Sequence, residues 1–440
     1  MSNNISNKIS FWAVFSIVTS SQIGSGIFTL PVCLAPYGVF GLFGCLLSGF
    51  GAIALCIVFA SLCSRLPYTG GPHVYVEHVF GKNLAFFSGW TYWVISWVST
   101  TAVIVTSIGY LSPFFSIVFG DHILFIQYHK EIFLLLEIVL LFLLTLLNLK
   151  GIKFAGNTEF FLMILKFIPL IVLPAIALFY FNKSNFIISP AVAHLSNSNM
   201  LSKVTLFGLW GFIGLETGTT PADSVVNPAV TIPKAIIFGT LSVALLYIWN
   251  FVGVMGLLPG TELMYSNAPY VDAAQKMFGG NWHLLIAIIA SVSCVGTLNA
   301  WIITSGQISL GLANDGLFPK IFGITNKGNA PVYSIIISCS GIVPLLVLTS
   351  AGSLSQQIAK IIDISVISFL FVYLICVISF LKLLIKEKNK SIGIYLITII
   401  ALIFCGWIIY ETPATTLLTA SLFTFSGVPL YLFWYCRTKK

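Results

Sequence analysis

The sequence has 440 residues, of which 58% are hydrophobic and only 8% are charged. A soluble domain carries about a quarter charged residues, so this composition excludes a soluble enzyme or binding module and favours a polytopic membrane protein. The net charge of +8 comes from loop lysines, so it does not indicate a nucleic-acid partner.

Twelve apolar segments follow one another along the chain, each close to the roughly 20 residues that a membrane-spanning helix needs. The first begins at Phe11 and is too long for a signal peptide, so we expect it to stay in the membrane. The loops are short, which predicts a single transmembrane domain over residues 1–440. The predicted spans are centred near residues 23, 50, 101, 140, 169, 214, 246, 297, 342, 371, 401 and 425.

The lysines and arginines of the loops are distributed unevenly between the two sides of the membrane. If the N-terminus is cytoplasmic, fifteen lie in cytoplasmic segments, and only Lys130, Lys183, Lys203 and Lys276 lie on the opposite side. By the positive-inside rule, this bias predicts twelve spans with both termini in the cytoplasm.

A glycine-rich break interrupts the first predicted span at Gly24-Ser25-Gly26. Lipid cannot satisfy the N–H and C=O groups that such a break exposes, so protein or a bound solute must do so. The ends of half-helices can hold the charged groups of a small solute. The break therefore predicts a binding site near the bilayer midplane.

The fifth predicted span contains Lys166, whose ammonium must face the protein interior and find partners there. The alternative is a lysine that snorkels to the membrane surface. Glu137 in span 4 and Glu159 at the start of span 5 have no motif around them, and we interpret both as structural.

The sixth span repeats the pattern of the first, with Gly211 and Gly214 near its centre and the intramembrane carboxylate Glu216 after them. Paired interruptions of this kind are typical of transporters built from inverted repeats. The breaks lie five spans apart, in spans 1 and 6. Because five is an odd number, the second repeat must have opposite topology. We expect repeats over about 10–181 and 201–385, with peripheral helices over about 391–436.

A further charge, Asp363, lies in the tenth predicted span. It can pair with Lys360, one turn earlier, as a structural ion pair, or it can contact substrate; the sequence leaves its role open. The nine cysteines and six histidines lack metal-ligand spacing. We therefore expect no metal and no cofactor, and the absence of a phosphate loop or nucleophile constellation argues against an enzyme.

Several motifs together resemble the amino acid–polyamine–organocation transporter family over nearly the whole chain. The closest pattern is that of the basic amino acid/polyamine antiporters, such as the arginine/agmatine and putrescine/ornithine exchangers. The resemblance implies an all-α protein of 12 helices with a LeuT-type 5+5 inverted repeat, discontinuous helices 1 and 6, and alternating access. The motifs are Gly24-Ser25-Gly26-Ile27-Phe28, Thr69-Gly70-Gly71-Pro72, Leu209-Trp210-Gly211-Phe212-Ile213-Gly214-Leu215-Glu216, Ile232-Pro233-Lys234-Ala235 and Asp315-Gly316-Leu317-Phe318-Pro319.

The resemblance implies how the broken helices hold a substrate. Backbone N–H groups at Ser25 and Gly26 would bind its carboxylate. Freed carbonyls of Ile23, Trp210 and Ile213 would accept hydrogen bonds from its ammonium. The Trp210 indole would lie over the bound side chain and close the outward path, with a cation–π attraction where that side chain is cationic.

By the same resemblance, Tyr92, Trp301 and Tyr373 match gate positions, for which simple packing is the alternative. Glu216 matches a gating and coupling position, for which the alternative is a purely structural hydrogen-bond acceptor. Ser365 matches a substrate contact.

In proton-coupled relatives and some exchangers, a lysine at the position of Lys166 stands where sodium-coupled members of the fold bind their ion. We hypothesise that Lys166 tethers spans 1, 5 and 8 and makes sodium unnecessary. Thr100 and Val103 depart from the amide and methionine of the arginine exchanger. Both changes shrink or simplify the distal pocket, so a shorter or more apolar substrate than arginine is expected.

The predicted function is secondary active transport of amino acids across the cell inner membrane, most simply as amino acid or amino acid/polyamine antiport. A proton-coupled symporter is the alternative, and a non-transporting receptor is a third hypothesis. A channel is disfavoured because no filter-like segment is visible. The expected partners are small amino acids or polyamines and the lipid bilayer. Protons belong to the symport alternative, and a homodimer stays open.

Overall fold

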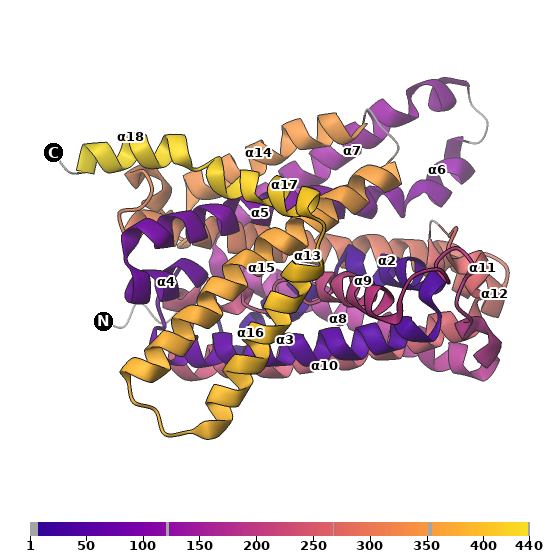
Figure 1. Ribbon diagram of the computed structural model, residues 1–440. Helices are drawn as coiled ribbons and strands as arrows, with labels where there is room; N and C mark the ends of the chain where they lie inside the picture. The colour runs from indigo at the N-terminus through magenta and orange to yellow at the C-terminus, as the bar shows by residue number, and fades with distance from the viewer. Residues whose placement is uncertain (1–7, 120–122, 267, 351–353, 439–440) are drawn as a thin grey trace.

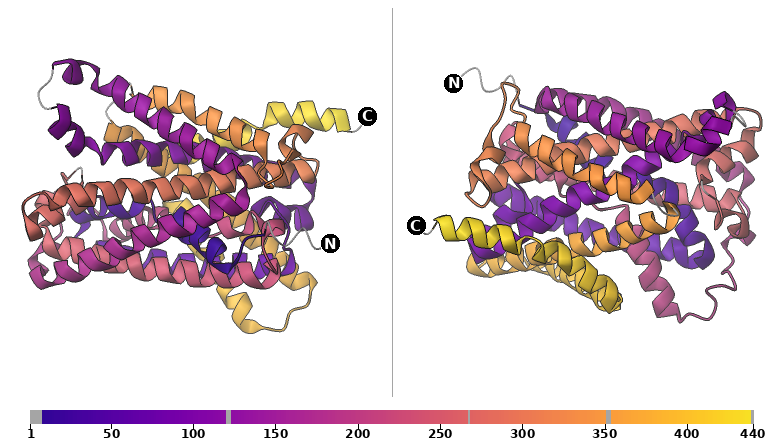
Figure 2. Two further views of the ribbon diagram at one scale, coloured as in Figure 1. Left: turned by 180° about the vertical axis from the view of Figure 1, so that it is seen from behind. Right: turned by 90° about the horizontal axis from the view of Figure 1, so that it is seen from above.

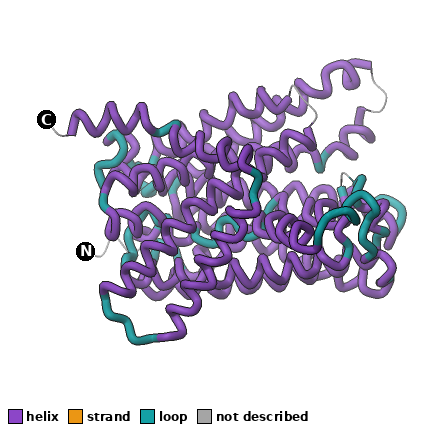
Figure 3. Tube along the Cα trace, in the orientation of Figure 1, coloured by secondary structure: helices purple, strands orange, loops and turns teal. Residues whose placement is uncertain are grey.

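The computed structural model describes residues 8–119, 123–266, 268–350 and 354–438. Helices and short turns make up this described part, and its only extended pairings are two isolated bridges, Ile9 with Val225 and Thr325 with Pro331. The loops gather mainly at the two ends of the bundle (Figure 3). This is the arrangement expected of helices that cross a membrane repeatedly.

Ten helical segments in the described part are long and apolar enough to span a membrane. Most predicted spans correspond to one of them, and the predictions near residues 342 and 214 are the exceptions. The apolar stretch Val332–Leu348 is shorter than the others, and residue 214 lies between two helices. The long helices, with the broken segments given as pairs, are α1 (Phe11–Gln22) with α2 (Ser25–Leu34), α3 (Val39–Arg65), α5 (Lys82–Gly109), α7 (Ile123–Leu149), α8 (Ile152–Ala177), α9 (Asn197–Trp210), α10 (Pro228–Leu257), α13 (Trp282–Asn314), α14 (Val332–Ser350), α15 (Leu354–Lys386), α16 (Ile392–Glu411) and α17 (Ala414–Phe425) with α18 (Val428–Thr438).

Short helices lie in the connections between the long ones. They are α4 (Pro72–Phe80), α6 (Ser112–Phe119), α11 (Gly260–Leu263) and α12 (Pro269–Phe278). Proline opens α4 and α12 at a position where its missing N–H removes no helical hydrogen bond.

The break in the first span is confirmed. α1 ends at Gln22 and α2 begins at Ser25, and Ile23 and Gly24 between them leave the helical conformation. A Cβ atom on Gly24 would lie 2.7 Å from Cγ2 of Thr297. Glycine is therefore required here by the close approach of α13.

The sixth span is also interrupted, but it does not resume as an α-helix. After Trp210 the chain forms turns and the short 3₁₀ helix η5 (Thr217–Thr219) before α10 begins. Gly214 has φ +104°, a conformation that side chains rarely adopt. The apolar pattern predicted a span centred here, because buried turns and buried helices carry similar residues.

The long helices pack in two groups. α3 packs against α9 and α10, and α1 packs against α10, whereas α5 and α14 pack against α13 and α7 packs against α14. In Figure 1, α3 and α10 run along the lower face and α7 and α14 along the upper face. α8 contacts α1 and α10 of the first group and α13 of the second. The broken first span thus lies where the two groups meet.

The C-terminal helices lie at the edge of the bundle (Figures 1 and 2). Only 11% of the most apolar stretch of Ala414–Phe433 is buried, against 83% for the broken first span. The described chain begins and ends at the same end of the bundle (Figure 2). Both termini on one side is what the charge distribution predicts, and which side faces the cytoplasm stays a prediction.

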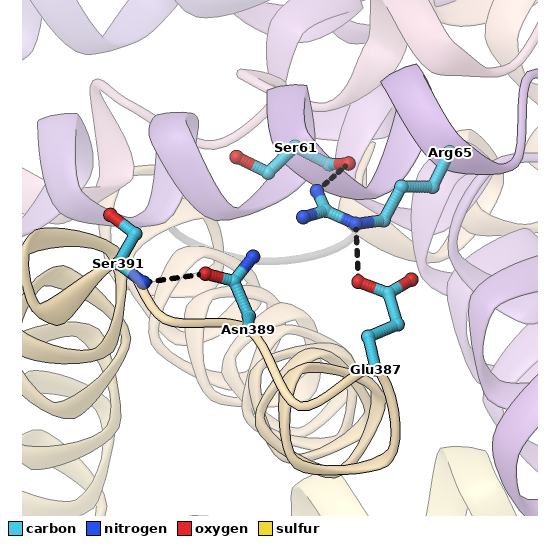
Figure 4. Close-up of polar contacts among 5 residues, drawn as sticks. All are labelled: Ser61, Arg65, Glu387, Asn389 and Ser391. Carbon is cyan, nitrogen blue, oxygen red and sulfur yellow. Dashed lines mark hydrogen bonds and ion pairs between the residues drawn. The ribbon is translucent and has the colours of Figure 1, made fainter.

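The end of α3 is joined to the end of α15 by a partly exposed ion pair (Figure 4). Arg65 Nε lies 3.2 Å from Glu387 Oε2, and Arg65 Nη1 donates to the Ser61 carbonyl at 2.9 Å. Asn389 Oδ1 accepts from the Ser391 N–H at 2.8 Å and shapes the following turn. Exposed pairs contribute little stability, typically about 0–1 kcal/mol, so this contact mainly sets the position of the loop.

Candidate functional site

The end of α1 is held by side chains from two other helices. Lys166 on α8 donates to the Ile23 carbonyl at 3.1 Å and to the Ser20 carbonyl at 3.4 Å. Thr297 Oγ1 on α13 lies 2.8 Å from the Ser20 carbonyl and 2.6 Å from the Ile23 carbonyl. The last carbonyls of a helix have no partner within it, so these contacts satisfy groups that the break exposes. Lys166 thereby joins α1, α8 and α13.

The two carbonyls between Ser20 and Ile23 are satisfied as well. The Trp301 indole N–H on α13 donates to the Ser21 carbonyl at 3.2 Å, and the Tyr247 hydroxyl on α10 donates to the Gln22 carbonyl at 3.0 Å. The whole C-terminus of α1 is therefore held by side chains from α8, α10 and α13. Moving α1 would break all of these hydrogen bonds.

The beginning of α2 faces the predicted gate residue Trp210. Ser25 and Gly26 are buried, and a Cβ atom on Gly26 would lie 2.9 Å from Cδ1 of Trp210. The indole therefore packs directly over the backbone of α2. The Ser25 hydroxyl is buried without a hydrogen-bond partner in the described part of the chain. With the N–H groups of a helix N-terminus, it forms a polar face suited to an anion.

The two breaks contact each other. Ser21 Oγ lies 2.9 Å from both the Gly214 carbonyl and the Thr217 hydroxyl. A Cβ atom on Gly214 would lie 2.7 Å from Ser21 Oγ. The glycine thus allows both the turn and the close approach of the two broken segments.

A cavity of about 20 Å³ lies between the breaks. This volume is close to the room that one buried water needs, so the space is smaller than any amino acid. Its walls are hydroxyls, one amide, backbone, two indoles and the aliphatic side chains of Val103 and Ile213, and none of its lining side chains is charged. The lining residues are Ser21, Gln22, Gly24, Ser25, Gly26, Ser99, Val103, Trp210, Ile213, Thr297 and Trp301.

Several predicted site residues are brought together at this cavity. Ser25, Gly26, Trp210 and Ile213 line it, together with the predicted gate residue Trp301. These positions come from α2, α13 and the two breaks, so distant parts of the sequence meet here.

Other predicted substrate contacts lie outside the cavity lining. The carbonyl of Ile23 already accepts from Lys166 and Thr297. The Thr100 hydroxyl donates to a carbonyl of its own helix at 2.7 Å. Ser365 is fully buried, and its hydroxyl has no hydrogen-bond partner among the described residues.

The predicted gate residues form a second cluster around Glu216. The carboxylate is fully buried and accepts a hydrogen bond from the Tyr373 hydroxyl, which in turn accepts from the Gly214 N–H at 3.2 Å. Tyr92 lies beside the same carboxylate. This arrangement couples the second break to α5 and α15.

Phe369 connects this cluster to the cavity. Its ring lies 5.8 Å from that of Tyr92, 5.3 Å from that of Trp301 and 6.3 Å from that of Tyr373. The three predicted gate aromatics therefore surround one phenylalanine. A change at Glu216 can reach the cavity wall through these rings.

Sequence reasoning missed Ser99, Thr297 and Phe369. Ser99 lies four residues before Val103, so helical spacing could have placed both on the face that lines the cavity. The run Ser20-Ser21-Gln22 before the glycines was a further signal, because polar residues rarely cluster inside an apolar span. Thr297 and Phe369 had no distinguishing sequence signal. The side chains of Asp363 and Lys360 lie outside the described part of the chain, so their predicted pairing stays open.

Comparisons with known proteins show the family to which the chain belongs. Residues 9–433 match the model of the amino acid permease family. The chain is 29% identical over 432 residues to the putrescine transporter of Haemophilus influenzae, covering 97% of each chain. It is 28% identical over 440 residues to the putrescine transporter of Escherichia coli, covering 98% of this chain and 97% of that one.

A third relative is the cadaverine/lysine antiporter of Escherichia coli, 26% identical over 372 residues and covering 83% of this chain and 81% of that one. The family match spans almost the whole chain, including both breaks and the gate cluster. The chain is therefore a membrane transporter-like protein that belongs to the amino acid permease family, within the amino acid–polyamine–organocation transporters.

Proposed function

We propose that this protein exchanges an aliphatic diamine for its parent amino acid across the inner membrane by alternating access. The observation that carries the proposal is the small, uncharged cavity between two broken helices, walled by Trp210 and Trp301. Relatives named for putrescine transport and for cadaverine/lysine antiport support the substrate class and the exchange.

The cavity walls suit the parts that a diamine and an amino acid share. Val103 and Ile213 offer apolar surface to an alkyl chain, and Trp210 offers its indole face to an ammonium. The N–H groups at Ser25 and Gly26 would bind a carboxylate when the amino acid is present. The Ile23 carbonyl already accepts from two side chains, and the Trp210 carbonyl accepts from the Ile213 N–H at 3.3 Å, so the Ile213 carbonyl is the best placed of the three for the α-ammonium.

The proposed mechanism needs the site to open. A cavity of about 20 Å³ cannot hold a four-carbon diamine, so α1 and its neighbours must move away from α13 during transport. We propose twelve spans, with inverted repeats over about 10–181 and 201–385 and peripheral helices over about 391–436. The packing of α1, α3, α9 and α10 apart from α7 and α14 supports this arrangement.

Gating and coupling are proposed for the cluster around Glu216. Tyr92, Trp301 and Tyr373 would shift together through Phe369 when substrate enters. Lys166 would replace a coupling sodium ion, as its position among the α1 carbonyls supports. Thr100 and Ser365 would contact the distal end of the substrate only in the opened cavity.

Uptake into proteoliposomes tests the proposal. Vesicles preloaded with putrescine, cadaverine, ornithine or lysine should take up radiolabelled putrescine or its amino acid, whereas empty vesicles should not. Trp210→Leu should abolish most of this exchange. Uptake into empty vesicles that depends on an inward proton gradient would instead establish symport, which the buried Lys166 and Glu216 make the second candidate. Binding without flux in either setting would support a receptor.

A further inference from the structure

Glu159 is a buried carboxylate that the proposed mechanism does not yet use. It lies on α8, two helical turns before Lys166, and is fully buried. Its Oε2 accepts from the Asn299 amide at 2.7 Å, but its Oε1 has no hydrogen-bond partner among the described residues. A buried acceptor without a donor is unfavourable, and more so when the group is charged. A group that occupies Oε1 in another state of the protein would offset this.

Lys166 is the cation nearest to that oxygen, and Gly296 on α13 lies between the two. A Cβ atom on Gly296 would lie 2.9 Å from Lys166 Nζ and 3.2 Å from Glu159 Oε1. Both charged groups thus border the same point on the surface of α13. The absence of a side chain on Gly296 leaves a path between them.

The two charges are anchored to different parts of the molecule. Asn299, which binds Glu159, also accepts from Asn148 on α7 at 2.9 Å and donates to the Ala155 carbonyl at 3.2 Å. Glu159 is therefore fixed to α7, α8 and α13. Two of the three oxygens that receive Lys166 are carbonyls of α1, which is broken beside them.

We propose that Glu159 is the second resting place of the Lys166 ammonium during transport. When α1 swings away, it withdraws the Ser20 and Ile23 carbonyls, and the ammonium moves past Gly296 to pair with Glu159 Oε1. The ammonium keeps its proton, so no ion enters or leaves. This inference rests on the proposed exchange function, and it explains how the protein cycles without a coupling cation: the carboxylate supplies the charge that α1 takes away.

Few other titratable groups face this pair. α13 contributes the Cys294 thiol, which lies near Lys166. α10 contributes Tyr247, whose hydroxyl is directed to the Gln22 carbonyl. α1 contributes backbone carbonyls and the buried Ser20 hydroxyl, which lies beside the Glu159 carboxylate. α7 contributes the neutral Asn148. A pH-dependent change caused by Glu159 substitution should therefore come from Lys166.

The test compares Glu159→Gln with Glu137→Gln, the matched change of a buried carboxylate on α7. Glu159→Gln keeps an acceptor for Asn299 but removes the charge. We expect its exchange rate to fall by about tenfold or more at neutral pH, as when a buried charge loses its partner. Its remaining rate should rise with pH, because Lys166 must now lose its proton before it can leave α1. Glu137→Gln should keep the wild-type rate and pH profile.

Two further variants separate pairing from simple structural damage. Glu159→Gln/Lys166→Met should regain pH independence and part of the rate. Gly296→Ala should slow exchange while substrate binding is retained, because its methyl group lies between the two charges. A Glu159→Gln variant with the wild-type rate and pH profile, or a double variant with the strong pH dependence of Glu159→Gln, would overturn the proposal.

A readout without transport keeps the two proposals distinguishable. In detergent, the Tm values of the wild type, Glu159→Gln, Lys166→Met and the double variant Glu159→Gln/Lys166→Met form a double-mutant cycle. Non-additive changes in Tm support the Glu159–Lys166 coupling even if wild-type vesicles show no exchange, a result that would refute only the proposed function. Additive changes would overturn the coupling even if exchange is robust.

Discussion

Thr297 is the residue whose hydroxyl joins α13 to the end of α1. It is buried, and its hydroxyl lies within 2.8 Å of the Ser20 and Ile23 carbonyls. Valine has nearly the same shape but cannot donate. Its introduction would leave Lys166 as the main donor to these two carbonyls.

We therefore expect Thr297→Val to lower the free energy of unfolding by about 1–3 kcal/mol, the range for an unsatisfied buried polar group. The measurement is Tm in detergent by a thiol-independent fluorescence assay. Thr304→Val is the matched control, because the Thr304 hydroxyl on the same helix donates only to the Ala300 carbonyl at 2.8 Å. Equal losses in the two variants would show that the hydroxyl contact at the break adds no stability.

At the residue scale, the sequence predicted the kind of role that a residue has better than the partners that it contacts. Glycines in an apolar span predicted the break, and a lysine in such a span had to be buried with partners. The sequence did not show that Thr297 and Lys166 share the Ile23 carbonyl, because both lie far from it along the chain. That contact depends on how α1, α8 and α13 pack, which no local pattern encodes.

At the scale of elements, α4 is joined to the end of α13 by a hydrogen bond. His73 Nε2 lies 2.8 Å from Asp315 Oδ2, and the Lys82 ammonium donates to the Asp315 carbonyl at 3.2 Å. Glu77 lies on α4, one turn after His73. Partial burial, and next the nearby Asp315 carboxylate, raise the pKa of Glu77 above its ordinary value of 4.5.

A raised pKa means that the folded protein holds the Glu77 proton more tightly than the unfolded chain. Ionisation therefore disfavours the folded state as pH rises from about 4.5 through the raised pKa, and the penalty is constant above it. We expect Glu77→Gln to have a higher Tm than the wild type at pH 8, with the gap closing toward pH 4.5. The measurement is the Tm of both proteins at several pH values between 4.5 and 8. A difference in Tm that widens as pH falls would contradict this expectation.

The broken elements show why the sixth span was predicted only in part. Its glycines predicted the interruption correctly, but the span predicted around residue 214 also extended a helix beyond them, where the structure has turns and η5. These residues are buried against α1 and α10, and turn hydrogen bonds such as Thr219 N–H to the Glu216 carbonyl at 2.8 Å take the place of α-helical ones. Apolar character alone cannot separate the two conformations.

At the scale of the whole molecule, composition and motif order were sufficient to predict a polytopic member of this transporter family. They could not predict the state of the site. The structure encloses a cavity of about 20 Å³, so binding must begin from a more open form. The population of that form lowers the apparent affinity of every substrate by the same factor. Comparisons between substrates therefore report on the pocket itself.

The rise in Tm that each substrate causes can therefore be compared between substrates. A ligand that binds only the folded protein stabilises it by about 2.7 kcal/mol at 100 times its Kd. We expect putrescine, cadaverine, ornithine and lysine to raise Tm, and arginine and agmatine to raise it less at equal concentration. The physical reason is that Val103 lines the cavity with an apolar side chain, and Thr100, on the same helix, carries a short hydroxyl bonded to that helix rather than an amide that could reach a guanidinium.

Val103→Met and Thr100→Asn together provide the converse test. These changes introduce the larger side chain and the amide that the arginine exchangers carry at these positions, so the Tm shift with arginine should grow relative to that with ornithine. If arginine stabilises the wild type as strongly as ornithine does, the distal wall on α5 does not set substrate length. Discrimination would then have to come from α15, where Ser365 lies buried.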